Sequence, residues 1–267
     1  LQKSANKEYI FARRFDEILA PINWKITQSS LYNAIWISRK FANMYLCQNG
    51  LPITYGGKTN PQFKGYMKID DEFQDRDNRM RYTMMRPHDN FWNNQKPRTS
   101  WDGKDKNPYI SNFVPKTGTG YHNQKWATER KVEDKKEGYD FPIIRYAEVL
   151  LNYAEAMNEY LSSPSQDVYD AIIALRARAG IEAGNDESPY GLKKNMTQAE
   201  MREVIQNERR IEMAFEEQRY WDIRRWRIAE EIFKNPLEGL EIRVKGNTTS
   251  FNEVDVLSTT FDVKRYL

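Results

Sequence analysis

Aromatic side chains beside amide groups are the residues of this sequence whose chemistry is easiest to interpret. Trp92 and Asn93 are adjacent, Trp101 precedes an aspartate, and Tyr121 and Trp126 enclose a run of amide and basic residues. Sugars present apolar C–H faces and hydroxyl edges, so they are bound by flat rings flanked by such polar groups. These five residues are therefore candidate glycan contacts. The alternative interpretation is that the rings pin long loops to the body of the protein.

A cluster of acidic residues offers a second kind of chemistry. Asp70, Asp71 and Glu72 are consecutive, and Asp75 and Asp77 follow closely. Glycoside hydrolases use paired carboxylates as acid and base, and carboxylate oxygens are also suitable ligands for calcium. However, no glycine occupies the place that a calcium-binding loop requires, and clustered acids are commonly just solvated. A carboxylate-dependent glycoside hydrolase is therefore the alternative to a non-catalytic binding protein.

Several other chemistries are excluded by what the sequence lacks. It contains no Gly-rich phosphate loop, no nucleophile elbow and no His-containing triad. One cysteine and two histidines are too few for a Cys/His zinc site, and a single cysteine cannot form an internal disulfide. We therefore expect no catalysis and no cofactor, and we assign no metal ligands, although a metal bound through oxygen ligands alone remains open. No run of eighteen apolar residues is present, and the first residues lack the layout of a signal peptide, which leaves the localisation open.

An Arg- and Trp-rich run at positions 219–226 has two possible uses. Such residues can stack on bases and hold phosphates, but the net charge of +3 provides no long-range field for nucleic acid. Helical spacing alternates the charges with the rings, and nearby carboxylates can neutralise the guanidinium groups. We therefore expect no nucleic-acid partner and instead predict a structural network of Glu208, Arg209, Arg210, Asp222, Arg224 and Arg225.

The elements that position these residues change in character near residue 140. Residues 1–140 are rich in Asn, Gly, Pro and Trp and are predicted to be a loop-rich ligand-binding region, with a strand at 9–15 and a helix at 38–48. Residues 141–267 show helical periodicity and are expected to pack on that region as one compact unit. The predicted helices span 143–161, 166–179, 198–215 and 218–233, and Thr197 and Glu200 form a capping box before the third. The tail from Glu241 can add extended segments.

Four blocks of this sequence resemble the SusD/RagB family of outer-membrane glycan-binding lipoproteins. Three are helical: FPIIRYAEVLLNYAEA from Phe141, ALRARAG from Ala174, and NERRIEMAFE from Asn207 together with RYWDIRRW from Arg219. The fourth is RDNRM from Arg76, where the family turn usually has Pro in place of Asn78. Glu217 also departs from the pattern, because the family often has Gly there.

This resemblance covers the C-terminal half of the family fold and implies a mainly α protein. The expected architecture is a tetratricopeptide-like helical scaffold with long loop-rich insertions and minor β structure. The implied function is binding of an oligosaccharide or polysaccharide at the cell surface and its delivery to a SusC-like TonB-dependent transporter. The implied location is the outer membrane, reached through a lipid anchor not in this chain. Cys47 follows Leu46 rather than a small residue, so we interpret it as a core thiol and not as the lipidation site.

Overall fold

The structure is a computed structural model that describes residues 6–16, 22–23, 37–66, 71–84, 121, 123–126, 136–137, 140–234, 237–244 and 254–261. The chain forms two compact units that alternate along the sequence. The first consists of Leu1–Lys25, Gln48–Gly50 and Arg130–Arg219, and the second of Ile26–Cys47, Leu51–Glu129 and Tyr220–Leu267. The proposed division into ranges 1–140 and 141–267 stays a prediction.

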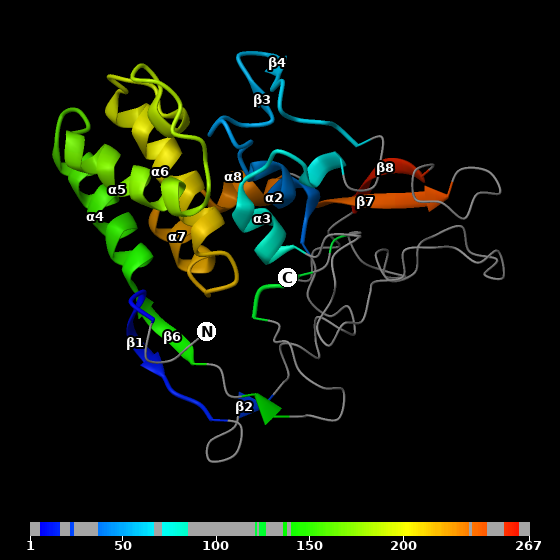
Figure 1. Cartoon of the computed structure of the whole chain (residues 1–267), viewed down its shortest axis with the longest axis horizontal. Coiled ribbons are helices and arrows are strands. Elements are labelled where there is room, and N and C mark those ends of the chain that lie inside the picture. Colours follow the sequence, from blue (N-terminus) through cyan, green and yellow to red (C-terminus); the bar gives the residue numbers. More distant parts are fainter. Residues whose placement is uncertain are drawn as a thin grey trace. The chain divides into compact units, whose positions relative to one another are not determined.

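Three helices form the core of the first unit. They are α4 (Tyr146–Tyr160), α5 (Gln166–Arg178) and α6 (Gln198–Glu212), and α4 packs against both of the others (Figure 1). Each helix turns an apolar stripe inward, as the three- and four-residue spacing predicts. The buried side chains that meet there include Leu151, Ala154, Ile172, Leu175, Met201 and Ile205.

Local signals fix the ends of these helices. The Thr197 hydroxyl accepts from the Glu200 amide, and the Glu200 carboxylate accepts from the Thr197 amide, so the predicted capping box is confirmed. At the end of α5, Gly180 takes a φ of 78° and its amide donates to Ala177 O, while the Ile181 amide donates to Arg176 O. This pair of bonds is a Schellman motif, which requires a left-handed residue and therefore favours glycine.

A short two-stranded ladder leads into α4. β1 (Tyr9–Arg13) pairs antiparallel with β6 (Phe141–Arg145), and the Tyr146 amide donates to Glu8 O where α4 begins. The sequence predicted the strand near residue 9 correctly. It was wrong in starting the helix at residue 143, because residues 143 and 144 belong to β6, in which Ile144 pairs with Phe11 of β1.

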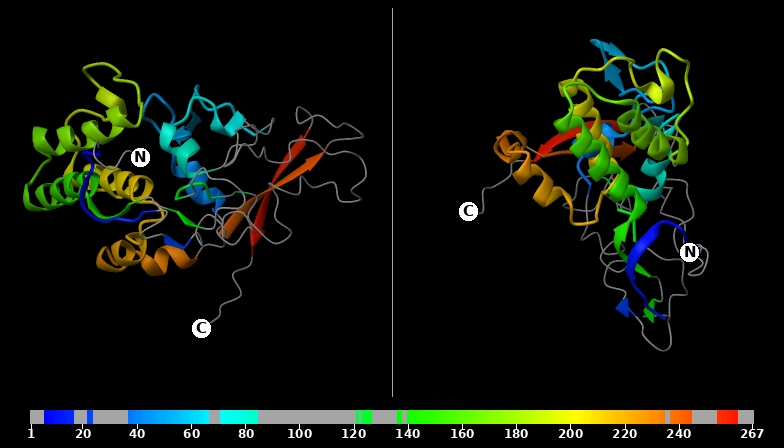
Figure 2. Two further views of the ribbon diagram at one scale, coloured as in Figure 1. Left: turned by 60° about the horizontal axis from the view of Figure 1, so that its bottom comes forward. Right: turned by 90° about the vertical axis from the view of Figure 1, so that its left-hand side faces the viewer.

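The second unit combines short helices with hairpins. Its helical segments are α2 (Arg39–Met44), the 3-10 turn Asp71–Phe73, α3 (Asn78–Thr83) and α8 (Ala229–Lys234). α7 (Arg219–Arg225) begins at the last residue of the first unit. The hairpins pair β3 (Thr54–Tyr55) with β4 (Lys58–Thr59), and β7 (Leu237–Val244) with β8 (Val254–Phe261) (Figure 2). A further ladder, which belongs to the first unit, joins β2 (Ile22–Asn23) to β5 (Lys136–Glu137).

The predicted helix at 218–233 is two helices in the structure. Arg227 has a φ of 58°, a left-handed conformation that ends α7 before α8 begins. The predicted helix at 38–48 is also shorter, since it ends at Met44. The mainly α class with a helical scaffold and minor β structure is confirmed, and no sheet closes on itself among the described residues. Within those residues, no helix combines the length and the apolar character needed to cross a membrane.

Candidate functional site

The candidate site is assembled from the parts of the second unit that hold the predicted ring residues. Trp92, Asn93 and Trp101 lie outside the described residues, so their role as glycan contacts stays a prediction. Tyr121 and Trp126 are described, together with residues 123–125 between them. The structure therefore shows how the candidate glycan contacts Tyr121 and Trp126 are held.

Residues 123–126 are attached to the C-terminal end of α3. The amides of Gln124 and Lys125 both donate to Thr83 O, at 2.7 and 3.4 Å, and Met84 and Asn123 form an antiparallel bridge. Asn123 is buried and closes its own turn, because its Nδ2 donates to Lys125 O at 2.9 Å while its Oδ1 accepts from the Lys125 amide at 3.2 Å. These hydrogen bonds fix the backbone that carries the side chains of Lys125 and Trp126.

We use the name aromatic–basic surface for two pairs of side chains on these segments, Arg81 with Tyr82 and Lys125 with Trp126. The ammonium group of Lys125 lies 5.7 Å from the centroid of the Trp126 ring, and the Arg81 guanidinium lies 5.7 Å from the Tyr82 ring. Tyr82 is 68% exposed, and Lys125 and Trp126 are partly exposed. Rings with cationic groups beside them suit a sugar, because the ring can stack on its C–H face while the cation donates to its hydroxyls.

Sequence reasoning missed Tyr82 as a member of this surface. The signal that could have found it is the burial period of α3, in which Met80 and Thr83 face inward. A residue between two inward-facing positions one turn apart points to solvent. An exposed tyrosine on a helix next to a predicted binding loop is therefore recognisable once the helix from Asn78 is identified.

Tyr121 occupies a different environment from the other rings. Its side chain is 3% exposed, and its hydroxyl donates to Glu72 Oε2 at 2.8 Å. Its ring is thus part of the packed interior, which favours the loop-pinning interpretation for this residue over stacking on a sugar. Burial raises the pKa of Glu72 to about 7, although the hydrogen bond from Tyr121 and the charges of Arg76 and Arg39 oppose that shift.

The buried side chain of Arg76 joins two segments of the second unit. Its buried guanidinium donates to the carbonyls of Ala42, Tyr45 and Leu46 and to Glu72 O, at 2.8 to 3.4 Å. The carbonyls at the end of a helix lack partners within the helix, so this one side chain supplies donors to the C-terminal end of α2. It simultaneously ties α2 to the turn that contains Glu72.

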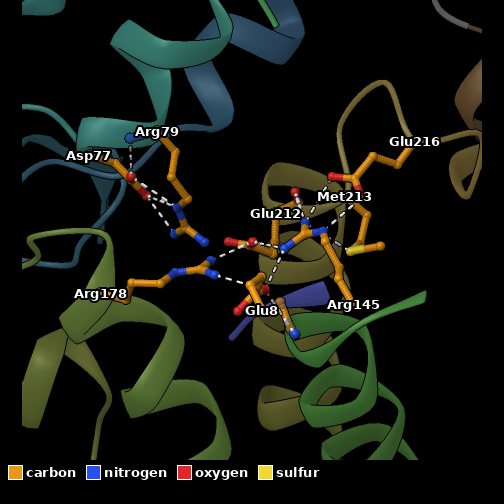
Figure 3. Close-up of polar contacts among 9 residues, drawn as sticks. Glu8, Asp77, Arg79, Arg145, Arg178, Glu212, Met213 and Glu216 are labelled. Carbon is orange, nitrogen blue, oxygen red and sulfur yellow. Dashed lines mark hydrogen bonds and ion pairs between the residues drawn. The ribbon is translucent and has the colours of Figure 1, made fainter. Parts of the chain in front are cut away.

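The other described acids of the predicted cluster also have structural contacts. Asp77 is the N-cap of α3, accepting from the Arg79 amide at 2.9 Å, and its carboxylate pairs with the Arg79 guanidinium at 2.6 Å (Figure 3). Asp75 pairs with Lys64 at 3.0 Å. Among the residues that the structure describes, no group of three or more His, Cys, Asp or Glu side chains could hold a metal ion.

The residues of the predicted structural network make several buried contacts in the first unit. Glu208 pairs with Arg176 at 3.0 Å, and both are almost fully buried. Arg209 donates to Asn152 Oδ1 at 2.7 Å and to Gln218 Oε1 at 3.1 Å. Burial, together with the charge of Arg219, lowers the pKa of Arg210 to about 10.

The remaining members of that set lie in the second unit. Buried Asp222 pairs with Arg225 at 2.9 Å, and the Arg225 guanidinium lies 4.7 Å from the Trp226 ring. Arg224 is exposed and lies over the Tyr220 ring at 4.2 Å. These contacts are consistent with a structural role, which stays a prediction.

Sequence reasoning missed an ion-pair cluster in the described part of the first unit, which surrounds Arg145. This guanidinium contacts Glu212 at 2.6 Å, Glu216 at 2.7 Å and Glu8 at 3.1 Å, and Arg178 contacts two of the same carboxylates (Figure 3). Glu8 Oε1 also accepts from the Ala147 amide at the start of α4. Burial by itself would lower the pKa of Arg145, but hydrogen bonds and charges from Glu216 and Glu212 raise it above its ordinary value.

Comparison with known proteins supports one family. The family model described as "SusD family" matches residues 4–266. SusD-like protein P2 of Formosa agariphila is 41% identical over 90 residues, which are 34% of this chain and 17% of that protein. A SusD-like carbohydrate-binding protein of Bacteroides fragilis is 26% identical, with a TM-score of 0.61 over 88% of this chain and 44% of its own.

A second SusD-like structure from Bacteroides fragilis shares the fold, at 22% identity and a TM-score of 0.64. It matches 97% of this chain and 49% of its own length. The chain thus spans less than half the length of these two solved relatives.

Proposed function

Because this chain belongs to the SusD family, we propose that it binds an oligosaccharide or polysaccharide without cleaving it. The aromatic–basic surface carries the proposal, since partly exposed rings and cations are held there on a backbone fixed by the Asn123 turn and by Thr83 O. A pre-organised surface binds with a smaller loss of conformational entropy. Trp92, Asn93 and Trp101 are proposed as further contacts.

Delivery of the glycan is the second part of the proposal. The family resemblance supports a partnership with a SusC-like TonB-dependent transporter at the outer membrane, to which this protein would be tethered by a lipid anchor. Coexpression with such a transporter and purification through a tag on one partner tests the association. Recovery of the other partner supports it, and its absence under conditions that retain both folded proteins contradicts it.

The alternative of a glycoside hydrolase would need a carboxylic acid that reaches the leaving-group oxygen. Glu72 has the raised pKa of such an acid, but its side chain is 3% exposed and is hydrogen-bonded to Tyr121. The raised pKa follows from burial and does not require a catalytic role. This environment favours binding over cleavage.

The test uses a panel of soluble glycans: pullulan, laminarin, xylan, galactomannan and polygalacturonate. We expect the protein to retain one class in affinity electrophoresis or calorimetry and to release no new reducing ends from any of them. Trp126→Ala should weaken binding of the retained glycan roughly thirtyfold, the usual effect of removing an anchor worth about 2 kcal/mol.

A matched variant separates stacking from a general loss of tryptophan. Trp221 is 66% exposed on α7, outside the proposed surface, so Trp221→Ala should change affinity less than about twofold. Equal binding by the parent and Trp126→Ala would move the site away from this surface. Release of reducing ends would replace binding with hydrolysis.

A further inference from the structure

We propose that Glu72 and Tyr121 form a buried positioning pair for glycan binding, in which the Glu72 carboxyl group holds Tyr121 and thereby fixes the segment that presents Lys125 and Trp126. This inference rests on the proposed function, because it assigns to the glycan-binding surface two residues that do not touch the ligand. It adds a role for a buried acid that neither catalysis nor metal binding explains.

The geometry of the pair supports a positioning role. Glu72 belongs to the 3-10 turn Asp71–Phe73, and its Oε2 accepts from the Tyr121 hydroxyl at 2.8 Å across 49 positions of sequence. Both side chains are 3% exposed, so a ligand on the surface cannot contact the bond directly. A hydrogen bond between a buried hydroxyl and a buried carboxyl is directional, and losing one partner leaves the other unsatisfied.

Glu72 is itself held firmly enough to serve as a fixed point. Arg76 Nη1 donates to Glu72 O at 2.9 Å, and the same guanidinium is bonded to the end of α2 through Ala42 and Tyr45. The charged and titratable groups near the carboxyl include Tyr121, Arg76, Arg39 and Tyr66. The Arg39 guanidinium also lies 4.3 Å from the Tyr66 ring, so it is restrained as well.

Tyr121 stands four positions before Lys125 in the sequence, so a restraint on Tyr121 also limits where the aromatic–basic surface can lie. Tyr121 O accepts from the Ile37 amide at 3.4 Å, and two residues later the buried Asn123 turn begins. Lys125 and Trp126 follow directly, with Trp126 at a φ of 70°. The segment is consequently attached at the Tyr121 ring, at the Asn123 turn and at Thr83 O.

Amide hydrogen exchange of the glycan-free protein tests the positioning step. Tyr121→Phe keeps the ring and removes the hydroxyl, and we expect the amides of Gln124 and Lys125 to exchange at least about tenfold faster, while α4 amides in the other unit stay unchanged. Glu72→Gln keeps an acceptor oxygen for Tyr121 and should retain most of the protection. Unchanged exchange of residues 124 and 125 in folded Tyr121→Phe would overturn the proposal.

Affinity for the glycan retained from the panel tests whether the pair acts through the surface. We expect Tyr121→Phe to weaken binding about fivefold in the parent and less than twofold in a Trp126→Ala background. The second effect is smaller because Tyr121 acts by positioning the Trp126 ring, which that background lacks. Equal losses in both backgrounds would show that the pair does not act through Trp126. Should the parent bind no glycan of the panel, the proposed function fails, whereas the exchange result still decides whether the pair positions the segment.

Discussion

Glu217 adopts a backbone conformation that ordinary residues avoid. Its φ is 62°, in the left-handed region where the Cβ atom of an L-residue is crowded by the following carbonyl. The resembling family often has glycine at this position, and glycine takes this conformation without that cost. The conformation of Glu217 therefore gives the family preference a physical reason.

We predict that Glu217→Gly stabilises the protein by about 1 kcal/mol, the usual cost of a non-glycine residue in this region. Glu217 is exposed, so little side-chain packing is lost. For a chain of this size, the gain corresponds to a rise in Tm of about 2–4 °C in thermal unfolding. Glu217→Ala is the control, because alanine keeps the crowded Cβ atom and should leave Tm nearly unchanged. An equal rise in both variants would locate the effect in the lost carboxylate.

Asn78 is a second position where this chain departs from the family pattern, and the structure shows why the family prefers proline there. It is the first helical residue of α3, directly after the N-cap Asp77, which has a φ of −44° and a ψ of 124°. Proline is favoured at this position because the amide of the first residue has no partner within the helix, and the residue before a proline prefers extended backbone. Asparagine fills the same position without that pre-organisation.

At the scale of elements, the Arg145 cluster joins β6, α6 and the chain before β1. We predict that Arg145→Met destabilises the first unit by about 3–5 kcal/mol, because it leaves the carboxylates of Glu212 and Glu216, whose side chains are 4% and 9% exposed, without their central cation. Urea unfolding followed by circular dichroism measures the change through the midpoint at constant slope.

Arg178 provides the matched control for this prediction. It pairs with Glu8 and Glu212, two of the carboxylates that Arg145 contacts, but its side chain is 44% exposed. Arg178→Met should therefore cost less than about 1 kcal/mol. Equal losses from the two variants would mean that burial does not decide the strength of these pairs.

The elements show which signals a single sequence carries. α6 begins at the predicted residue because Thr197 and Glu200 satisfy each other's orphan amides, and α5 ends where Gly180 permits the Schellman bonds. The start of α4 could not be predicted, since residues 143 and 144 fit a helix by spacing and form a strand only because β1 lies beside them. The break at Arg227 was hidden because no glycine or proline marks it.

For the candidate site, the sequence indicates the class of ligand but not which of its rings are exposed. Residues 121–126 contain the rings and amides that indicate a sugar ligand, and Trp126 is partly exposed as that interpretation requires. Nothing in the sequence distinguishes Tyr121 from Trp126, because the burial of Tyr121 depends on Glu72 at a distance of 49 positions. Contacts between residues so far apart arise from the fold and leave no local pattern.

At the scale of the whole molecule, Glu72 should make stability depend on pH. Burial raises the pKa of Glu72 from 4.5 to about 7, so the folded state keeps a proton that the unfolded state has already lost. The contribution of Glu72 to stability is therefore fully present below about pH 4.5 and is lost as the pH rises to about 7. The expected loss is about 2–3 kcal/mol across this window.

Glu72→Gln isolates this contribution from the other titrating groups. Glutamine does not ionise, so the difference in the free energy of unfolding between parent and variant should change by about 2–3 kcal/mol from pH 4.5 to pH 7.5, with the parent losing stability relative to the variant. Denaturant unfolding at several pH values measures it. A constant difference would show that Glu72 titrates alike in the folded and unfolded chains.

The buried thiol of Cys47 gives the second unit a built-in kinetic reporter. Cys47 is the single cysteine of the chain, its side chain is 0% exposed, and its amide donates to Leu51 O at 2.8 Å. Burial also raises the pKa of Cys47, which lowers its thiolate fraction. We expect an aromatic disulfide reagent to react with the native protein at least a hundredfold more slowly than with the urea-unfolded chain. The reaction rate of the native protein then measures how often local unfolding around α2 exposes the thiol. Equal rates in both states would show that the thiol is accessible in the native protein.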